Sequence, residues 1–572
     1  MKNQMVAETL YTIANLLDIK GENFFKIRAY RIAAQTIEGL DENIEKIAEE
    51  KRLTDIPGVG EALAKKILEL LTTGNIRYLE KLKREIPEGL LELLEIPGLG
   101  PKKVAALYTK LGITTIADLK KACEHGRLRH LEGFGEITER NILRGISLRE
   151  QTTGRVLLNV AYVDGMEYLD YLKRNTKIDE VSLAGSVRRM KETIGDLDIL
   201  VSSKHPEQIM EYFTQFPRVK KVLMKGVTKT SVQLDDLLQV DLRVVPDKSY
   251  GAALQYFTGS KEHNVAVRSL ASRKGYKLSE YGLFTKKNQK YVAGKNEHDI
   301  YQKLELSYIE PELRENRGEI EAAKKHQLPA LVRYDDMQGD FHVHSRWSDG
   351  FDDLTTLAQY AQTKGYQFLG STDHSKSLKI ANGLSEEKLK KKLSEIRKLN
   401  ETFSDFMILY GTECDILPDG TLDYSKKILS EFDFVYIGIH SRFKMTKKEM
   451  TQRIISGMET GFADFLAHPT GRMIGKREPF EVDVEKIFDT AKRTDMFLEI
   501  NAFPDRLDLN DVHIKQAREY GIRFVIGTDA HAVNHLDFMQ FGVAQARRGW
   551  LEKKDILNAY SFKKIKKILE IP

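Results

Sequence analysis

Two aspartates one residue apart, Asp196 and Asp198, stand in the otherwise apolar run GDLDILVSS. Successive side chains of a β-strand point to opposite faces, so both carboxylates would lie on one face of a strand. A third aspartate, Asp241, stands in the apolar run LQVDLRVV, on the same strand face as Arg243. Three carboxylates on neighbouring strands can bind two hard divalent cations, usually Mg²⁺ with a substrate phosphate. The pattern predicts phosphoryl transfer, although a lone Asp-x-Asp pair is often only a solvated acid pair.

The segment that precedes the aspartate pair, GSVRR, fits the same chemistry. Gly185 and Ser186 are expected in a turn whose backbone N–H groups can approach a phosphate. Arg189 can bind a charged phosphate oxygen. The turn and the carboxylates together therefore predict one site for a phosphorylated substrate.

The C-terminal part of the chain carries a second set of residues suited to metal chemistry. At or just after the ends of six short apolar runs stand nine histidines and acids: His342, His344, Asp349, His374, Glu413, His440, His468, Asp529 and His531. A βα barrel assembles its active site at the C-terminal ends of its strands. Imidazole and carboxylate ligands together suit Mn²⁺, Zn²⁺ or Fe²⁺ better than Mg²⁺ alone. A lone His-x-His pair often has no metal role, but nine such residues predict a metal site; His513 and His535 lack this placement and are expected at the surface.

Three similar segments in the first third predict helical hairpins: DIPGVGEALAKKI at 55–67, EIPGLGPKKVAAL at 95–107 and LEGFGEITERNIL at 131–143. Each combines a helix end, a tight turn with paired glycines and a new helix, the glycines being Gly58, Gly60, Gly98, Gly100, Gly133 and Gly135. Glycines allow close approach of a partner, and the N–H groups that open the second helix form an anion site. One copy could be an ordinary turn, but three copies indicate helix-hairpin-helix motifs that bind the phosphate backbone of nucleic acid without reading its sequence.

The elements that position these residues change along the chain. The first third has a helical pattern, and from about Val156 strands alternate with helices, as in KIDEVSLAGSV, GDLDILVSS and LQVDLRVVP, which indicates an α/β domain. The polar stretch 314–336 predicts a linker with some helix. Beyond it, seven apolar runs are each followed by a helical stretch and predict a barrel: DFHVHS, FLGSTDH, MILYGTE, FVYIGIH, FLAHPT, FLEINAF and RFVIGTDAH.

Composition limits the class of protein. A chain of 572 residues is too long for one core, and a prior of about 150 residues per domain gives three or four domains. Two distant cysteines, Cys123 and Cys414, exclude a disulfide framework and argue against a thiolate zinc site. No apolar run is long enough for a membrane span, and the opening MKNQMVAETLYTIANLL predicts an amphipathic helix and not a signal peptide. A net charge of +5 is compatible with a polyanionic partner but is weak support alone.

The segment GSVRRMKETIGDLDIL resembles the nucleotidyltransferase signature of the family X DNA polymerases, and LQYFTGSKEHNVAVRSLASRKGYKLSEYGLF resembles their nascent-base-pair subdomain. The resemblance extends from the N-terminus to about residue 315. It implies that Asp196, Asp198 and Asp241 hold two Mg²⁺, with Asp241 next to the primer 3′ hydroxyl. It also implies contacts to the triphosphate from Gly185, Ser186 and Arg189, to the sugar from Tyr256, Phe257 and Gly259, to the base from Asn264 and to the template strand from Arg268. Animal members of the family usually carry an arginine where this chain has Gln239. The primer phosphate is therefore expected to be held less tightly.

The N-terminal segment, GENFFKIRAYRIAAQTI with IPGVGEALAKKI, is similar to the small gap-binding domain of DNA polymerase beta. The similarity implies that Lys26 and Tyr30 line a 5′-phosphate pocket and that Lys66 is the Schiff-base lysine of a deoxyribose-phosphate lyase. Such a lysine must be partly neutral, which requires burial or a neighbouring cation, and Lys65 could help only if it faces the site. Ala62 replaces another expected lysine, and the alternative is that Lys66 only binds phosphate.

HVHSRWSDG, STDHS, GTECDI, IGIHS, AHPTG and GTDAH resemble the PHP (polymerase and histidinol phosphatase) domain over residues 336–572. This resemblance implies a distorted seven-stranded βα barrel with a trinuclear Mn²⁺ or Zn²⁺ cluster and phosphoester hydrolysis. Because every ligand position is filled, we expect a working nuclease.

The whole order of motifs resembles the bacterial family X DNA polymerases with a PHP domain. The expected domains are a gap-binding domain (1–87), an all-α helix-hairpin-helix subdomain (88–152), an α/β nucleotidyltransferase palm (153–246), an α+β nascent-base-pair subdomain (247–315), a linker (316–335) and the PHP barrel (336–572). The expected function is filling of short gaps in nicked or gapped DNA from dNTPs during base excision repair, with 3′–5′ exonuclease and candidate AP-endonuclease, 3′-end-cleaning and lyase activities. We expect a cytoplasmic, nucleoid-associated bacterial monomer without membrane contact. The alternatives are a repair nuclease whose polymerase half mainly positions DNA, and a non-catalytic DNA-binding scaffold.

Overall fold

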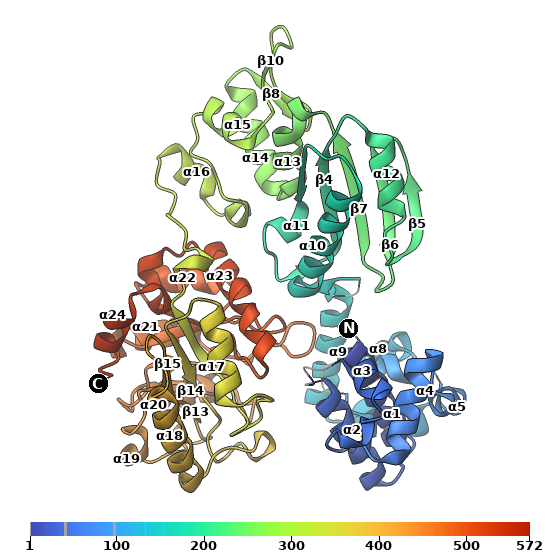
Figure 1. Ribbon diagram of the computed structural model, residues 1–572, viewed down its shortest axis with the longest axis vertical. Helices are drawn as coiled ribbons and strands as arrows, with labels where there is room; N and C mark the ends of the chain where they lie inside the picture. The colour runs from blue at the N-terminus through green and yellow to red at the C-terminus, as the bar shows by residue number, and fades with distance from the viewer. Residues whose placement is uncertain are drawn as a thin grey trace. The chain divides into compact units, whose positions relative to one another are not determined.

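The computed structural model describes the chain except residues 1, 39, 41, 42, 88, 95, 97, 98, 132, 153 and 572. Its contacts divide the chain into two compact units: residues 1–153 together with 475–477, and the remainder. Figure 1 shows both units in chain colours. Among the described residues, none of the helices has the length and apolar character that crossing a membrane requires.

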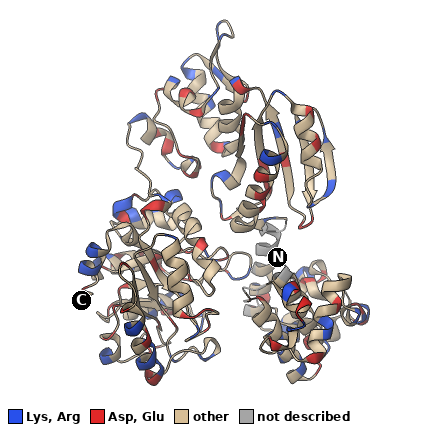
Figure 2. Ribbon diagram, viewed as in Figure 1, with Lys and Arg blue, Asp and Glu red and all other residues tan. Residues whose placement is uncertain are grey.

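The first unit is all-helical, as the sequence predicts. Its helices are α1 (Lys2–Ile19), α2 (Phe24–Glu38), α3 (Ile44–Glu49), α4 (Glu61–Thr73), α5 (Arg77–Glu85), α6 (Gly89–Leu94), α7 (Pro101–Leu111), α8 (Ile116–Glu124) and α9 (Glu136–Thr152). One face of each helix contributes aliphatic side chains to a single core, for example Leu10, Ile67 and Val104. Figure 2, a ribbon coloured by residue type, shows basic and acidic residues interspersed along these helices. The amphipathic helix predicted at the start of the chain is confirmed as α1.

The second unit begins with an α/β palm. Its elements are β1 (Val156–Leu157), α10 (Leu158–Asn175), β2 (Glu180–Leu183), α11 (Gly185–Arg188), β3 (Thr193–Ile194), β4 (Asp196–Ser202), α12 (Pro206–Thr214), β5 (Val219–Lys225), β6 (Lys229–Leu234) and β7 (Gln239–Val245). Five strands form one sheet in the order β2-β4-β7-β6-β5, in which only β4 and β7 run parallel. Side chains of α10 and α12 pack with those of the strands into one core.

A smaller α+β region follows. It contains α13 (Tyr250–Thr258), α14 (Lys261–Arg273), β8 (Tyr276–Ser279), β9 (Gly282–Thr285), β10 (Tyr291–Ala293), α15 (Glu297–Lys303) and α16 (Glu319–Lys324). The segment predicted as a linker contains the expected helix, α16, and is packed: Ile320 and Ala323 join the core of this region. Glu319 is fully buried and accepts a hydrogen bond from Asn316, which explains why so polar a segment is ordered.

The C-terminal part is the predicted barrel. Its elements are β11 (Gly339–Val343), α17 (Leu354–Thr363), β12 (Phe368–Ser371), α18 (Glu386–Asn400), β13 (Met407–Asp415), α19 (Lys426–Leu429), β14 (Phe434–Gly438), α20 (Lys447–Met458), β15 (Phe465–Leu466), α21 (Val484–Thr494), β16 (Phe497–Asn501), α22 (Asp511–Glu519), β17 (Phe524–Gly527), α23 (Met539–Arg548) and α24 (Phe562–Ile568). All seven strands are parallel and lie in sequence order. A bridge between Val343 and Ala530 brings the first and last strand together, so the barrel is nearly closed.

Candidate active sites

The palm sheet brings the three predicted aspartates together. The parallel register of β4 and β7 places Asp198 opposite Asp241, and Asp196 precedes Asp198 on the same strand face. Burial and then the carboxylates of Asp196 and Asp241 raise the pKa of Asp198 to about 7. The two neighbouring carboxylates therefore disfavour ionisation of Asp198 unless a cation lies among them. The donor set, oxygen only, fits the hard divalent cation that the sequence predicts.

Asp241 carries partners that the strand pattern could not predict. Lys229 Nζ lies 2.7 Å from its Oδ2, and Gln239 Nε2 donates to its Oδ1 at 2.9 Å. Burial would raise the pKa of Asp241, but these hydrogen bonds, Lys229 first, lower it below its ordinary value. Lys229 comes from β6, the strand beside β7, so only the strand order brings it to the carboxylate.

A cleft of about 470 Å³ opens beside Asp196 and Asp198. It is lined by the residues predicted for the nucleotide and the template strand, Gly185, Ser186, Arg189, Tyr256, Phe257, Gly259, Asn264 and Arg268, and by Arg155, Lys191 and Lys261, which the sequence reasoning missed. Gly185 has a φ of +62°, and a Cβ there would lie 2.3 Å from Asp198 Oδ2, so no side chain fits between the turn and the carboxylate.

Two of the predicted nucleotide contacts are held by their neighbours. The Asn264 side chain donates to the Tyr256 carbonyl at 2.6 Å and accepts from Gln255 at 2.7 Å. The Arg189 guanidinium donates to the carboxylate of Glu315 and to the carbonyl of Thr258. Arg268 is exposed at the cleft. The contacts of Asn264, Arg189 and Arg268 to substrate remain predictions.

The helical unit contains the three predicted hairpins. In each, the residue between the paired glycines donates its N–H to the carbonyl three residues earlier at 3.0 Å: Val59 to Ile56, Leu99 to Ile96 and Phe134 to Leu131. A Cβ at Gly60, Gly100, Gly133 or Gly135 would meet no atom within 4 Å, so these positions are open to a partner. A Cβ at Gly58, in contrast, would lie 2.6 Å from Ile32 Cγ2. Gly98 lies outside the described residues.

The residues of the predicted 5′-phosphate pocket share one aromatic ring. The Nζ atoms of Lys26 and Lys66 each lie 5.4 Å from the centre of the Tyr78 ring. Burial and then Tyr78 raise the pKa of Tyr30 to about 12. Lys65 is exposed, whereas Lys66 is half-buried, and the cation that shares Tyr78 with it is Lys26. The structure therefore brings Lys26, Tyr30 and Lys66 together and adds Tyr78, which the sequence reasoning missed.

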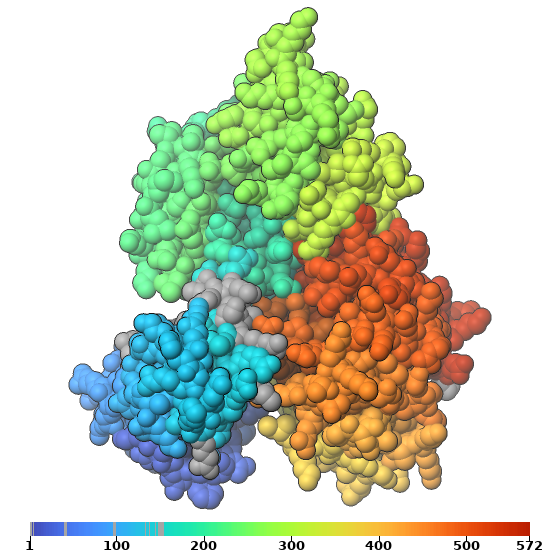
Figure 3. Space-filling model, turned by 180° about the vertical axis from the view of Figure 1, so that it is seen from behind, coloured from blue at the N-terminus to red at the C-terminus, as the bar shows by residue number. Residues whose placement is uncertain are grey.

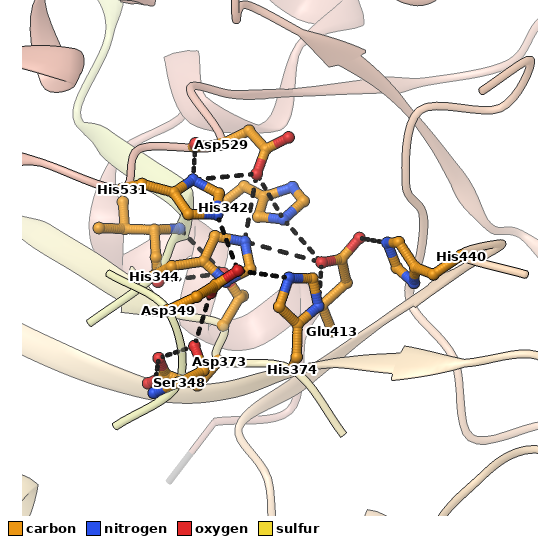
Figure 4. A network of polar contacts seen from close by, with 12 residues as sticks. His342, His344, Ser348, Asp349, Asp373, His374, Glu413, His440, Asp529 and His531 are labelled. Atoms are coloured by element: carbon orange, nitrogen blue, oxygen red, sulfur yellow. Dashed lines mark hydrogen bonds and ion pairs between the residues drawn. The ribbon is translucent and has the colours of Figure 1, made fainter. Parts of the chain in front are cut away.

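In the barrel, all nine predicted metal-site residues converge at one end. Figure 4 labels eight of them, all except His468. The nine residues come from the ends of six strands or the loops that follow, and eight of them form three sets that could each hold an ion: His344, Asp349, His374 and His531; His342, His344 and Asp529; His374, Glu413 and His440. His468 Nε2 lies 2.8 Å from Glu413 Oε1. His468 and Asp529 have φ values of +27° and +55°, in the positive-φ region that non-glycine residues seldom adopt.

Unpartnered ring nitrogens support metal binding by the histidines, independently of the spacing of these residues in the sequence. Buried ring nitrogens without a hydrogen-bond partner include His342 Nε2, both nitrogens of His344, His374 Nδ1 and His440 Nε2. The opposite nitrogens of two rings are held by carboxylates, since His342 Nδ1 lies 2.6 Å from Glu499 and His440 Nδ1 lies 2.5 Å from Asp415. A carboxylate on one nitrogen orients a histidine whose other nitrogen ligates a metal.

Neutral imidazole is the ligand form, and burial favours it at two positions. Burial, followed by His531 and His374, lowers the pKa of His344 to about 4. Burial and then Arg506 lower the pKa of His468 to about 3. At His440, burial would lower the pKa, but Glu413 and Asp415 raise it to about 10. A cation among these residues would replace the proton that His440 otherwise holds.

The expectation that His513 and His535 are surface residues is wrong, because both are half-buried. The His535 ring lies 5.2 Å from the Phe503 ring and 5.0 Å from the Phe538 ring, and its Nδ1 accepts from the backbone of His531. Burial lowers its pKa to about 4. The 3₁₀ helix Val533–Phe538 begins two residues after His531 and places the His535 ring against the His531 backbone.

Several residues that support the cluster were missed. Asp415 and Glu499 could have been found, because Asp415 shares a strand face with Glu413 and Glu499 lies on the sixth barrel strand. Asp373 accepts hydrogen bonds from Ser345 and Ser348, in the loop that leads to Asp349, and pairs with the fully buried Lys392 at 2.8 Å. Lys392 lies on the helix α18, where no sequence signal separates it from its exposed neighbours.

Comparisons with known families agree with this architecture. Residues 1–76 match the helix-hairpin-helix domain, 90–147 the SAM-like helix-hairpin-helix tandem, 253–315 the DNA polymerase beta thumb and 340–503 the PHP domain. These matches cover most of the helical unit, most of the α+β region and most of the barrel.

Comparison with individual proteins extends over the whole chain. The DNA polymerase/3′-5′ exonuclease PolX of Bacillus subtilis (strain 168) is 38% identical over 572 residues, which is 100% of both chains. DNA polymerase lambda of Arabidopsis thaliana is 27% identical over 314 residues, 49% of this chain and 54% of that protein. DNA polymerase lambda of Rattus norvegicus is 27% identical over 349 residues, 54% of this chain and 56% of that protein.

Proposed function

The chain belongs to the PolX family of DNA polymerases, and from this premise we propose that it fills short gaps in DNA and trims 3′ ends at two separate sites. It is a DNA polymerase with a PHP-dependent 3′–5′ exonuclease. The observation that carries the gap-filling proposal is the Asp198–Asp241 register beside a cleft lined by Gly185 and Arg189. The proposed substrates are dNTPs and nicked or gapped double-stranded DNA.

In the proposed polymerase reaction, the side chains act mainly by positioning and charge. Mg²⁺ bound by Asp196, Asp198 and Asp241 would neutralise phosphate charge and favour an ionised primer hydroxyl. The Gly185 turn lets the backbone approach the triphosphate, and the Arg189 guanidinium faces the same cleft. We assign the sugar contacts to Tyr256, Phe257 and Gly259.

In the barrel, we propose that the nine converging residues hold Mn²⁺ or Zn²⁺ and that the site hydrolyses phosphodiester bonds at 3′ ends and at abasic sites. Metals there would supply hydroxide near neutral pH and bind the scissile phosphate. Glu499 and Asp415 fix the ring orientations of His342 and His440. These contacts leave His342 Nε2 and His440 Nε2 facing the cluster.

We further propose that the helical unit binds the 5′ side of a gap through Lys26, Tyr30 and Lys66, and that Lys66 is the lyase nucleophile. Lys26 supports this site, because its amine lies on the same tyrosine ring as the amine of Lys66, so both can reach one 5′ end. We place the enzyme in the cytoplasm at the nucleoid, as a monomer acting in base excision repair.

One assay on the purified full-length protein tests the proposal. A short-gap substrate is incubated with and without dNTPs, in Mg²⁺ or Mn²⁺, and primer extension and 3′ degradation are followed together. Extension in Mg²⁺ and degradation in Mn²⁺ are expected. Negligible extension with strong degradation would favour a repair nuclease. The absence of both activities would favour a non-catalytic scaffold. A parallel reaction tests Lys66: a gap with a 5′-deoxyribose phosphate is incubated with borohydride, which reduces a lysine Schiff base to a stable covalent link. Covalent trapping that persists in Lys66→Met would contradict the lyase assignment.

The hairpins offer a matched pair of variants at Gly100, which caps α7 and whose Cβ would meet open space. Asparagine and aspartate are both good N-caps of similar size, so both variants should fold. Gly100→Asp adds a negative charge where we place a DNA phosphate, and binding should be roughly tenfold weaker than for Gly100→Asn. Dissociation constants on several unrelated duplex sequences provide the measurement. A loss confined to one sequence would contradict recognition of the phosphate backbone.

A further inference from the structure

The polymerase part and the barrel share buried side chains within the second unit. Leu507 and Phe541 belong to the barrel by sequence but are buried in the palm core. Trp550 likewise joins the core of the α+β region. In Figure 3 the yellow-green segment near residue 320 adjoins the orange-red C-terminal part of the chain. The two catalytic parts are therefore packed together like parts of one domain, and barrel residues can act on the polymerase cleft.

Arg548, the last residue of α23, makes the most direct connection. Its side chain is only 2% exposed. Its Nη1 donates to Glu315 Oε1 at 3.1 Å and to the backbone carbonyl of Arg189 at 2.6 Å, and its Nη2 donates to Asp511. A barrel side chain thus contacts the backbone of a residue that lines the polymerase cleft.

Glu315 joins the two arginines. Its Oε1 accepts from Arg189 Nε at 3.0 Å as well as from Arg548, and all three side chains are 12% exposed or less. Burial would raise the pKa of Glu315, but Arg548 and then Arg189 lower it, so the acid stays ionised. On the opposite side, the Arg189 guanidinium donates to the carbonyl of Thr258, and a Cβ on Gly259 would lie 3.1 Å from its Nη1. Arg189 is therefore fixed at its backbone and at its side chain.

We propose that Arg548, a residue of the exonuclease barrel, is a positioning residue for the nucleotide pocket of the polymerase. It shares Glu315 with Arg189 and fixes the Arg189 backbone, so that Arg189 faces the cleft with much of its positive charge available to a triphosphate. This inference rests on the proposed function, in which Arg189 binds the triphosphate. Without Arg548, the ionised Glu315 would keep Arg189 as its hydrogen-bonded partner, with Lys191 nearby, and would neutralise more of the Arg189 charge.

The test uses the full-length protein with Arg548→Met, which keeps bulk and removes charge, and Arg548→Lys, which keeps charge but cannot reach all three partners. Arg547→Met is the matched control, because Arg547 is the neighbouring residue and donates instead to Glu312 and to the Val332 carbonyl. The measurements are KM for dNTP and kcat in Mg²⁺-dependent gap extension, inhibition by pyrophosphate, DNA affinity, 3′ trimming and thermal stability.

Arg548→Met should lower kcat/KM for dNTP by roughly 10- to 100-fold, mainly through KM, because a small misplacement of a binding group costs that much. Pyrophosphate inhibition should weaken in parallel, while DNA affinity and 3′ trimming persist. Arg548→Lys should recover part of the loss, and Arg547→Met should keep the parental dNTP KM.

Two results would overturn the inference: an Arg548→Met protein with parental dNTP KM and pyrophosphate inhibition, or an equal KM increase in Arg547→Met, which would indicate general loosening of the contact. If Arg548→Met does not fold, Asp511→Asn removes the charge that holds Arg548 from the barrel side and should raise the dNTP KM in the same direction. An unchanged KM there would also overturn it. A parent that does not incorporate nucleotides would refute the proposed function instead.

Discussion

Replacing Asp198 with asparagine is expected to abolish nucleotide incorporation while 3′ trimming and DNA binding continue. Asp198 lies between Asp196 and Asp241 on the palm sheet, and an amide cannot replace a carboxylate between two cations. Loss of an outer partner of a metal ligand costs up to about 100-fold, so loss of the ligand itself should cost more. Single-nucleotide incorporation on a short gap in Mg²⁺ is the measurement. Gap filling near the parental rate would refute the assignment of the catalytic carboxylates.

A stability measurement separates this effect from misfolding. Because burial and two acids raise the pKa of Asp198, its ionised form opposes folding at neutral pH when no cation is present. In chelator, Asp198→Asn should therefore melt at or above the parental temperature, and added Mg²⁺ should stabilise the parent more than the variant. Asp235→Asn, which removes an exposed carboxylate paired with Arg218, is the control and should retain full incorporation.

Replacing His342 with alanine is expected to abolish 3′ degradation, and abasic-site cleavage with it, while gap filling continues. His342 is fully buried, and its Nε2 lacks a hydrogen-bond partner and faces the cluster. Because the three candidate ligand sets share His344 and His374, loss of one imidazole should lower metal occupancy and hydrolysis together, by more than about 100-fold in rate. Mn²⁺-stimulated release of 3′ nucleotides and the metal content of the purified protein are measured in parallel. We expect the same result for His468→Ala.

His513→Ala is the matched control for His342→Ala, because His513 lies in the same barrel on α22 but outside the cluster. It should keep both hydrolysis and metal content. His342→Ala also leaves the buried Glu499 without its imidazole, so its melting temperature must be recorded. Parental degradation by His342→Ala would place the nuclease elsewhere. A folded His342→Ala protein that cannot polymerise would show that the metal cluster itself is coupled to the polymerase.

Much of the architecture could be predicted because it depends on local periodicity. The alternation of strand residues predicted that Asp196 and Asp198 share one face. Both lie on β4, and the Asp196 carboxylate is close enough to raise the pKa of Asp198. Seven apolar runs predicted seven strands, and the barrel has them in that order. Paired glycines predicted three hairpins, and the hairpins share one turn hydrogen bond. In each case the signal lies within about ten residues of the element it describes.

Contacts between distant segments could not be predicted in this way. Lys229 reaches Asp241 only because β6 lies beside β7. Arg548 reaches Arg189 across 359 residues of chain. The sequence by itself determined which residues could do chemistry and which elements hold them, because side-chain type and strand or helix period are local properties. Only the tertiary structure decided which charged side chains of different segments pair with one another, because strand order and domain packing depend on how the apolar surfaces of whole elements are buried together.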